Sequence, residues 1–227
     1  MNSHHTNRLK LMDIISRVVP SAFFLFVVML KSIELYTFLE VHYSTNEPVS
    51  WKFFVDVASR CSTVCFLALM TSLFFFRLQP VGKAKTLLPR VMAIIGTFFV
   101  ALVTLFPRAN LSMTQMVIAS LISFFGTTMS IIALAHLGRS FSLMAEARRL
   151  VTTGPYRIIR HPLYLFEEVA SFGVLLQFFS FYTGVLFLIH VCIQLQRMKN
   201  EEVVLEKAFP EYQAYKESTA RLIPKFY

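Results

Sequence analysis

The densest group of polar side chains in this apolar chain occupies residues 152–164, with the sequence Thr-Thr-Gly-Pro-Tyr-Arg-Ile-Ile-Arg-His-Pro-Leu-Tyr. Gly154-Pro155 is typical of a turn, and Pro162 suits the first turn of a helix, where its missing N–H group costs nothing. A helix that begins there would direct unpaired N–H groups toward the cytoplasm, beside Arg160 and His161. This arrangement favours the binding of a carboxylate. The alternative is a basic collar that binds lipid phosphates.

A second polar group follows an apolar stretch and contains Arg197, Glu201 and Glu202. Adjacent carboxylates can accept hydrogen bonds from ribose hydroxyls or from an ammonium group, which suits one end of a cationic, nucleotide-like ligand. Arg197 lies one helical turn before Glu201, so the alternative interpretation is an ion pair that only stabilises the helix.

Two further carboxylates, Glu167 and Glu168, lie inside an apolar stretch, where an ionised carboxylate is costly and normally faces protein, water or a partner. Glu168 is four residues from Tyr164, so the two side chains are expected on one helix face. We expect these carboxylates either to face a substrate or to pair with a structural partner such as Arg139 or Arg60.

The remaining ionisable residues favour structural roles. Two pairs have the spacing of helix neighbours and are expected to form ion pairs within one helix: Asp56–Arg60 and Lys31–Glu34. His136 and His190 have no second ligand at i+3 or i+4, and the three Cys residues lack metal-binding spacing. No metal site is therefore predicted.

The elements that must position these groups are predicted to be membrane-spanning helices. Of the 227 residues, 56% are apolar and 15% are charged, and the mean hydropathy of +0.59 is too high for most soluble domains. Each apolar stretch within lipid must be helical, because an unpaired backbone group there is costly. Six such stretches occur: Val18–Val41, Phe53–Phe76, Val91–Phe106, Leu111–Leu137, Pro162–Phe179 and Phe181–Gln196. The last two are short and predict a tight helical hairpin.

The basic residues are concentrated in alternate segments between these stretches. Of 22 Lys and Arg residues, 18 fall in the two terminal tails and the second and fourth loops, two fall in the other loops and two lie inside stretches. By the positive-inside rule, both termini and both polar groups are cytoplasmic. This topology accounts for the net charge of +9 without nucleic acid. We expect a multi-pass integral membrane protein, in the inner membrane if bacterial or the endoplasmic reticulum if eukaryotic.

The predicted fold class is all-α, a multispan transmembrane helical bundle of about six membrane segments. Residues 1–17 are expected to form an interfacial segment, and residues 18–137 a four-helix transmembrane region. Residues 138–227 are expected to form a C-terminal region with the helical hairpin. Apolar residues keep a helical spacing after Gln196, so the last helix should continue into the cytoplasm, with Pro210 as an interruption.

Several motifs in this C-terminal region resemble the signature of the isoprenylcysteine carboxyl methyltransferases and, more loosely, of the phospholipid N-methyltransferases. They are, in chain order, Gly154-Pro155-Tyr156, Arg160-His161-Pro162-x-Tyr164, Arg197, Glu201-Glu202, Leu205, Phe209, Tyr212, Tyr215, Arg221 and Pro224. The resemblance covers about His136–Tyr227. The family often has Gly two residues after the motif Tyr, where this chain has Phe166.

The resemblance implies a membrane enzyme that binds S-adenosylmethionine at its cytoplasmic face, without a Rossmann domain. Its acceptor would be a membrane lipid or an isoprenylated molecule that arrives from the bilayer. The matching positions imply a cofactor site made of Gly154, Tyr156, Arg160, His161, Pro162, Tyr164, Glu201 and Glu202. Arg160 is also a candidate catalytic residue, together with Glu167 and Glu168.

Methyl transfer is an in-line displacement, so the alignment of nucleophile, methyl group and sulfur supplies much of the acceleration. A carboxylate nucleophile needs no base, whereas an amine must lose a proton, which His161 or a Glu residue would accept. The leading prediction is therefore methyl transfer to a lipid carboxylate. The alternatives are phospholipid N-methylation, an NADPH-dependent membrane reductase, whose Arg-His motif is typically followed by Asn-Tyr, and a lipid-binding membrane protein without catalytic activity.

Overall fold

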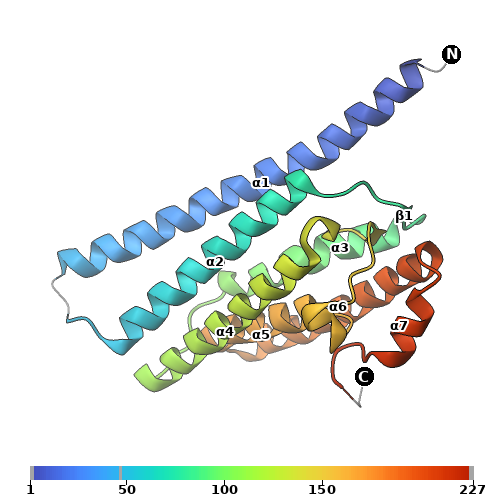
Figure 1. Ribbon diagram of the computed structural model, residues 1–227. Helices are drawn as coiled ribbons and strands as arrows, with labels where there is room; N and C mark the ends of the chain where they lie inside the picture. Colours follow the sequence, from blue (N-terminus) through green and yellow to red (C-terminus); the bar gives the residue numbers. More distant parts are fainter. Residues whose placement is uncertain (1–2, 46–47, 225–227) are drawn as a thin grey trace.

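The computed structural model describes residues 3–45 and 48–224, which are predominantly helical (Figure 1). The helices are α1 (Ser3–Ser44), α2 (Trp51–Phe76), α3 (Leu88–Phe98), α4 (Met113–Leu137), α5 (Pro162–Gln177), α6 (Phe181–Ala208) and α7 (Tyr212–Ser218). Three short 3-10 helices are η1 (Phe99–Leu105), η2 (Gly138–Ser140) and η3 (Gly154–Arg157). Strands β1 (Gly82–Lys83) and β2 (Glu146–Ala147) form a small antiparallel pair. The predicted all-α fold class is confirmed.

Five candidate spans among the described residues are long and apolar enough to cross a bilayer. They are Arg17–Ser44, Trp51–Phe76, Leu88–Leu105, Met113–Ser140 and Phe181–Ala208. The sixth predicted segment is α5, whose 16 residues extend about 24 Å. It packs with α6 as a hairpin, and Ser180 caps the N-terminus of α6. As predicted, α6 continues past Gln196 and ends before Pro210.

Two predicted elements differ in detail from the structure. α1 passes residues 17 and 18 without a break and contains Pro20, so the predicted interfacial segment continues directly into the first span. The side chains of residues 1–13, 15 and 16 lie outside the described part of the chain, and the interfacial location stays a prediction. The third predicted span consists of α3 followed by η1, because the helix tightens at Phe99.

Small residues allow α4 and α5 to approach closely. A Cβ atom added to Gly126 would lie 2.3 Å from the backbone nitrogen of Ala170 and 2.9 Å from the carbonyl oxygen of Phe166. A Cβ atom added to Gly173 would lie 2.3 Å from the hydroxyl of Ser123. Such contacts are typical of packed helices in membranes. The close approach is therefore present even though Phe166 occupies the position where the family often has Gly.

Arginine side chains from other segments cap the C-terminal end of α2. Each of three arginines donates to a different carbonyl group: Arg17 to Arg77 (2.6 Å), Arg139 to Phe76 (2.7 Å) and Arg148 to Leu78. The last carbonyls of a helix lack intrahelical partners and carry partial negative charge, so cationic donors stabilise them. These contacts tie α1, α2 and the segment after α4 together at one end of the bundle.

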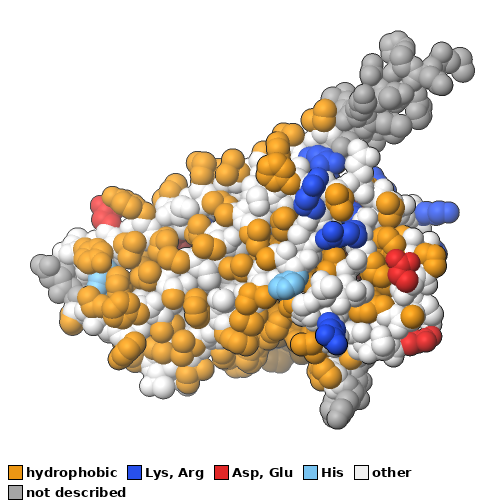
Figure 2. All heavy atoms as spheres, viewed as in Figure 1, with side chains coloured by type: hydrophobic (Ala, Val, Ile, Leu, Met, Phe, Trp, Pro, Cys, Tyr) orange, Lys and Arg blue, Asp and Glu red, His pale blue; other side chains and the backbone are white. Residues whose placement is uncertain are grey.

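The surface of the bundle is divided into a long apolar part and a basic end. On the face shown in Figure 2, hydrophobic side chains cover most of the length of the bundle, and Lys and Arg side chains gather toward the end that carries α7. The start of α1 lies toward that end as well (Figure 1). This one-sided arrangement supports the predicted topology, while the orientation relative to the cytoplasm stays a prediction.

Candidate active site

The turn before α5 depends on a glycine. Gly154 begins η3 with φ +59°, a conformation that favours glycine, and a Cβ atom there would lie 2.1 Å from the ring of His136. Pro162 is the first residue of α5, as the sequence predicted. Gly154 and Pro162 therefore shape the backbone that carries Arg160 and His161.

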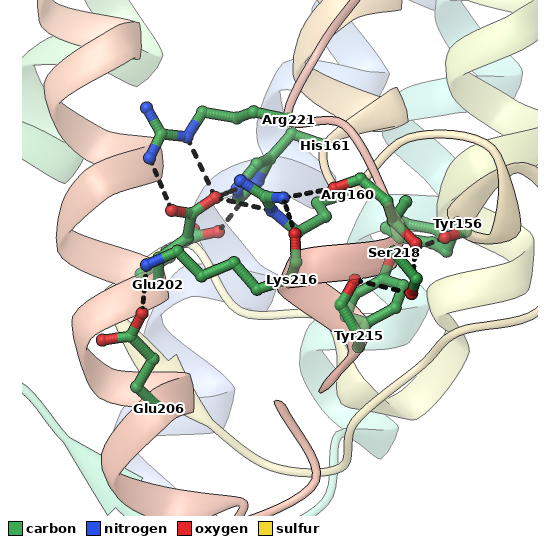
Figure 3. Close-up of polar contacts among 11 residues, drawn as sticks. Tyr156, Arg160, His161, Glu202, Glu206, Tyr215, Lys216, Ser218 and Arg221 are labelled. Carbon is green, nitrogen blue, oxygen red and sulfur yellow. Dashed lines mark hydrogen bonds and ion pairs between the residues drawn. The ribbon is translucent and has the colours of Figure 1, made fainter. Parts of the chain in front are cut away.

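Glu202 of α6 connects the two polar groups that lie about 40 residues apart in the sequence (Figure 3). Its carboxylate accepts hydrogen bonds from Arg160 Nε (3.0 Å) and from Arg221 Nη2 (2.7 Å), and it lies 3.1 Å from His161 Nε2. The side chain of Glu202 is only 4% exposed. The carboxylate expected beside the N-terminus of α5 is thus supplied by the chain itself.

The end of α7 and the segment after it complete this arrangement. The N–H groups of Arg160 and His161 donate to the carbonyl oxygens of Ala220 (2.8 Å) and Arg221 (3.1 Å). The guanidinium of Arg160 also donates to the carbonyl oxygen of Lys216 (2.8 Å). The backbone before α5 is therefore fastened to residues 216–221, and most donors of Arg160 have partners within the chain.

Glu201 has a different environment from its neighbour. Its carboxylate accepts a hydrogen bond of 2.5 Å from the hydroxyl of Tyr164. The guanidinium of Arg197 lies over the Tyr164 ring, 5.2 Å from its centroid. Arg197 donates to the side-chain oxygen of Gln194 (2.6 Å) and has no carboxylate within 4.0 Å among the described residues. The predicted alternative, an ion pair between Arg197 and the adjacent glutamates, is therefore not formed.

These residues surround one end of a cavity of about 650 Å³, a volume typical of ligand-binding pockets. The polar end is lined by Tyr156, Arg160, His161, Tyr164, Glu201 and Tyr212. From there the cavity extends between the helices, past Glu167 and Arg197, to Phe24 of α1 and Met70 of α2. It thus links the polar end of the bundle to its membrane-spanning interior.

Several buried polar atoms of cavity-lining residues have no hydrogen-bond partner within the described ranges. They include the hydroxyls of Tyr156 and Tyr212 and the Nε atoms of Arg148 and Arg197. Burial raises the pKa of the Tyr156 and Tyr212 hydroxyls well above the usual value, so both stay neutral and can donate. Since buried polar groups are normally hydrogen-bonded, these atoms fit a polar ligand in the cavity.

Tyr215 supports this end of the cavity from α7. Its hydroxyl donates to the carbonyl oxygen of Tyr156 (2.6 Å), and burial raises the pKa of Tyr215 to about 12. The neutral hydroxyl therefore fastens α7 to η3 at physiological pH.

The two adjacent carboxylates of α5, Glu167 and Glu168, lie in different environments. Glu167 lines the cavity and has no ion pair within 4.0 Å among the residues that the structure describes. Glu168 lies 2.9 Å from Nε2 of His190 on α6. The expectation that Arg139 or Arg60 would be its partner is wrong, because Arg139 caps α2 and Arg60 binds a residue of α1.

The predicted ion pairs within helices are half correct. Lys31 and Glu34 form theirs at 2.7 Å. Asp56 pairs with Lys52 at 2.6 Å instead of Arg60, and Arg60 reaches across to Glu34 at 2.6 Å. The error arises because spacing along one helix does not reveal partners on the neighbouring helix.

The structure therefore brings all the predicted site residues except Glu168 to the wall of the cavity or to the segments that support this wall. Glu202, Gly154 and Pro162 lie outside the lining, and Glu201, Tyr156, Tyr164, Arg160 and His161 lie within it. Arg197 is a lining residue that the predicted site did not include. The sequence contained a signal for this role, since a buried arginine in an apolar helix, close to two adjacent glutamates, is costly without a function.

Comparison with known proteins concerns the same part of the chain. No curated protein matches it. Residues 117–207 match the Isoprenylcysteine carboxyl methyltransferase (ICMT) family, and this range includes η3, α5 and most of α4 and α6. The match supports a membrane methyltransferase in general. It confirms the resemblance of this region to the isoprenylcysteine carboxyl methyltransferases.

Proposed function

We propose that this protein transfers a methyl group from S-adenosylmethionine to a lipid-like acceptor, most simply the carboxylate of an isoprenylated cysteine or a related small lipid acid. One observation carries the proposal. Two motifs far apart in the sequence meet at the polar end of a cavity that continues into the membrane-spanning bundle. Such a cavity suits a polar donor at one end and an apolar acceptor along the rest.

The residues at the polar end fit the donor. S-adenosylmethionine, when bound, supplies a methyl group on a positively charged sulfur. Glu201 keeps acceptor capacity beyond its bond to Tyr164, which suits ribose hydroxyls or an ammonium group. The hydroxyls of Tyr156 and Tyr212 add two buried donors without partners in the described chain. Glu202 would act indirectly, by holding Arg160 and its neighbours in place.

Arg197 would orient the acceptor. The residue is 7% exposed and lines the cavity, and its guanidinium lacks a carboxylate partner within 4.0 Å in the described part of the chain. A negatively charged acceptor group would supply that partner. Because a carboxylate nucleophile needs no base, alignment and the exclusion of water are the remaining tasks, and the packed helices perform the second.

N-methylation of a phospholipid is a second candidate, and Glu167 is the observation that favours it. This carboxylate lines the cavity without an ion pair among the described residues, so it would suit the ammonium group of an amine acceptor. It would also accept the proton that an amine must lose before it attacks a methyl group.

The test of the reaction uses the purified protein in lipid nanodiscs with membrane lipids and S-adenosylmethionine that carries a labelled methyl group. An alkali-labile methyl ester would support carboxyl methylation, and a stable methylamine would support N-methylation. No label in any lipid extract would contradict both. Binding of NADPH, measured by calorimetry, would instead favour a reductase.

The donor site is tested separately by binding of S-adenosylmethionine. Glu201→Ala and Arg160→Ala are each expected to weaken binding at least about tenfold, since each removes charge-assisted hydrogen bonds. Glu206→Ala is the matched control, because Glu206 lies on the same helix but pairs with Lys216 outside the cavity. Donor affinity that survives both Glu201→Ala and Arg160→Ala would refute the site.

A further inference from the structure

A second polar site lies deeper in the same cavity, where α5 and α6 pack within the bundle. His190 lines the cavity, and its Nε2 atom is 2.9 Å from a carboxylate oxygen of Glu168. His190 precedes Arg197 by seven residues and Glu201 by eleven, which corresponds to about 10 Å and about 16 Å along the helix axis. This histidine–glutamate pair is therefore separate from the polar end of the cavity.

The environment of His190 fixes its ring and leaves one nitrogen unsatisfied. The ring stacks on Phe99 with an interplanar angle of 10° and contacts Phe187, with centroid distances of 6.5 Å and 6.4 Å. Its side chain is 3% exposed, and Nδ1 has no hydrogen-bond partner in the described part of the chain. Both carboxylate oxygens of Glu168 are likewise buried without a hydrogen bond in the described ranges, so the contact with Nε2 is an ion-pair contact by distance only. Leaving buried polar atoms unpaired costs stability, so a structural role alone does not explain this pair.

The cavity wall in this region is more polar than a hydrocarbon chain requires. It includes Ser123, Thr127, Ser130, Ser171, Gln177 and Gln194. Ser123 and Gln177 donate to helix carbonyls, but the hydroxyl of Ser130 is buried without a partner in the described ranges. An unsubstituted isoprenyl chain would displace water from this wall and form no hydrogen bond with it.

We propose that His190, beside Glu168, binds a hydroxyl group on the apolar part of the acceptor, so that the acceptor is a hydroxylated lipid. A hydroxyl can donate to unprotonated Nδ1 or accept from protonated Nδ1, so it fits either state of the ring. The axial separations place this hydroxyl roughly 10 to 16 Å from the reacting end of the acceptor. The inference rests on the proposed function, because it identifies the cavity as the acceptor site.

The test compares two probes that differ by one group: S-farnesylcysteine, and the same compound with a hydroxyl at the far end of the farnesyl chain. Binding to the full-length protein in nanodiscs is measured without the methyl donor. The hydroxylated probe is expected to bind about tenfold more tightly, the size of one well-formed hydrogen bond in a buried site.

His190→Phe is the decisive variant, because it keeps the aromatic contacts with Phe99 and Phe187 and removes both nitrogens. It should abolish the preference by weakening only the hydroxylated probe. Glu168→Gln should reduce the preference in a second, independent variant by removing the negative charge 2.9 Å from Nε2. Cys192→Ala, an exposed position on the same helix, should retain it.

Equal binding of the two probes to the wild-type protein, or a preference that survives His190→Phe, would overturn the inference. Labelled methyl transfer, measured in parallel, separates it from the proposed function. A hydroxyl preference without methylation of either probe would contradict carboxyl methylation and keep this site. Methylation of both probes without a preference would do the reverse.

Discussion

Within the span that contains α1, 6% of the most apolar stretch is buried, whereas 44% is buried in the span that contains α4. α1 packs chiefly on α2 and presents large apolar side chains outward, among them Phe26 and Ile33. α4, by contrast, packs closely on α5, and residues 154–221 are joined by buried polar contacts. The geometry of the candidate site is therefore fixed by the C-terminal region, while α1 and α2 contribute one wall and a lipid-facing surface.

The largest effect is expected from Glu202→Ala. It removes the carboxylate shared by Arg160 and Arg221 in a site where that carboxylate is 4% exposed. Breaking a buried ion pair from one side typically costs about 3–5 kcal/mol, so the melting temperature in nanodiscs should fall strongly and donor binding should disappear. Glu202→Gln keeps the shape and part of the hydrogen bonding, so its loss should be smaller. An unchanged melting temperature for Glu202→Ala would contradict the conclusion that the buried polar contacts of the C-terminal region fix the geometry of the site.

Gly126→Ala should have the next largest effect, because the added Cβ atom would meet the backbone of α5 at 2.3 Å. Overpacking of this kind costs about 1–3 kcal/mol, measured as a loss of thermal stability. Gly184→Ala is the matched control, since a Cβ atom there meets no atom within 4 Å. It should be neutral or stabilising by up to about 1 kcal/mol, as helix propensity favours Ala. Equal losses for both variants would show that the contact between α4 and α5 is not limiting.

Arg139→Gln tests the boundary between α2 and the C-terminal region. It removes a cationic donor from the carbonyl oxygen of Phe76 at the end of α2. The expected cost is about 0.3–1 kcal/mol, because Arg139 is exposed and water replaces part of the contact. The melting temperature should decrease slightly, while the affinity for S-adenosylmethionine stays that of the wild type. A large loss of donor affinity would instead place Arg139 in the site.

The smallest effect is expected from Phe26→Ala on the outer surface of α1, where the side chain is 54% exposed. Surface substitutions typically change stability by less than about 0.5 kcal/mol, so the melting temperature and donor affinity should match those of the wild type. A loss as large as that of Gly126→Ala would mean that this face of α1 packs against another protein surface in the membrane.

The sequence allowed the helical class, the start of α5 at Pro162 and the convergence of the two polar motifs to be predicted, because each depends on local composition or on an ordered motif. It did not reveal that Arg60 binds Glu34 or that Glu168 pairs with His190, since these partners lie on neighbouring helices. The internal role of Glu202 depends on the segment around Arg221 folding back over α5, which no local pattern encodes. Nothing in the sequence marks the change to a 3-10 helix at Phe99.

The attachment of residues 216–221 to the backbone before α5 has a consequence for biosynthesis. These residues leave the ribosome after all the membrane-spanning helices that surround the cavity, so Arg160 and Glu202 are synthesised before Arg221 and the carbonyl oxygens of Lys216 and Ala220 can reach them. A nascent chain thus completes its membrane integration while its ligand pocket is still unfinished. The contacts that close the polar end of the cavity can therefore form only after Arg221 has been synthesised.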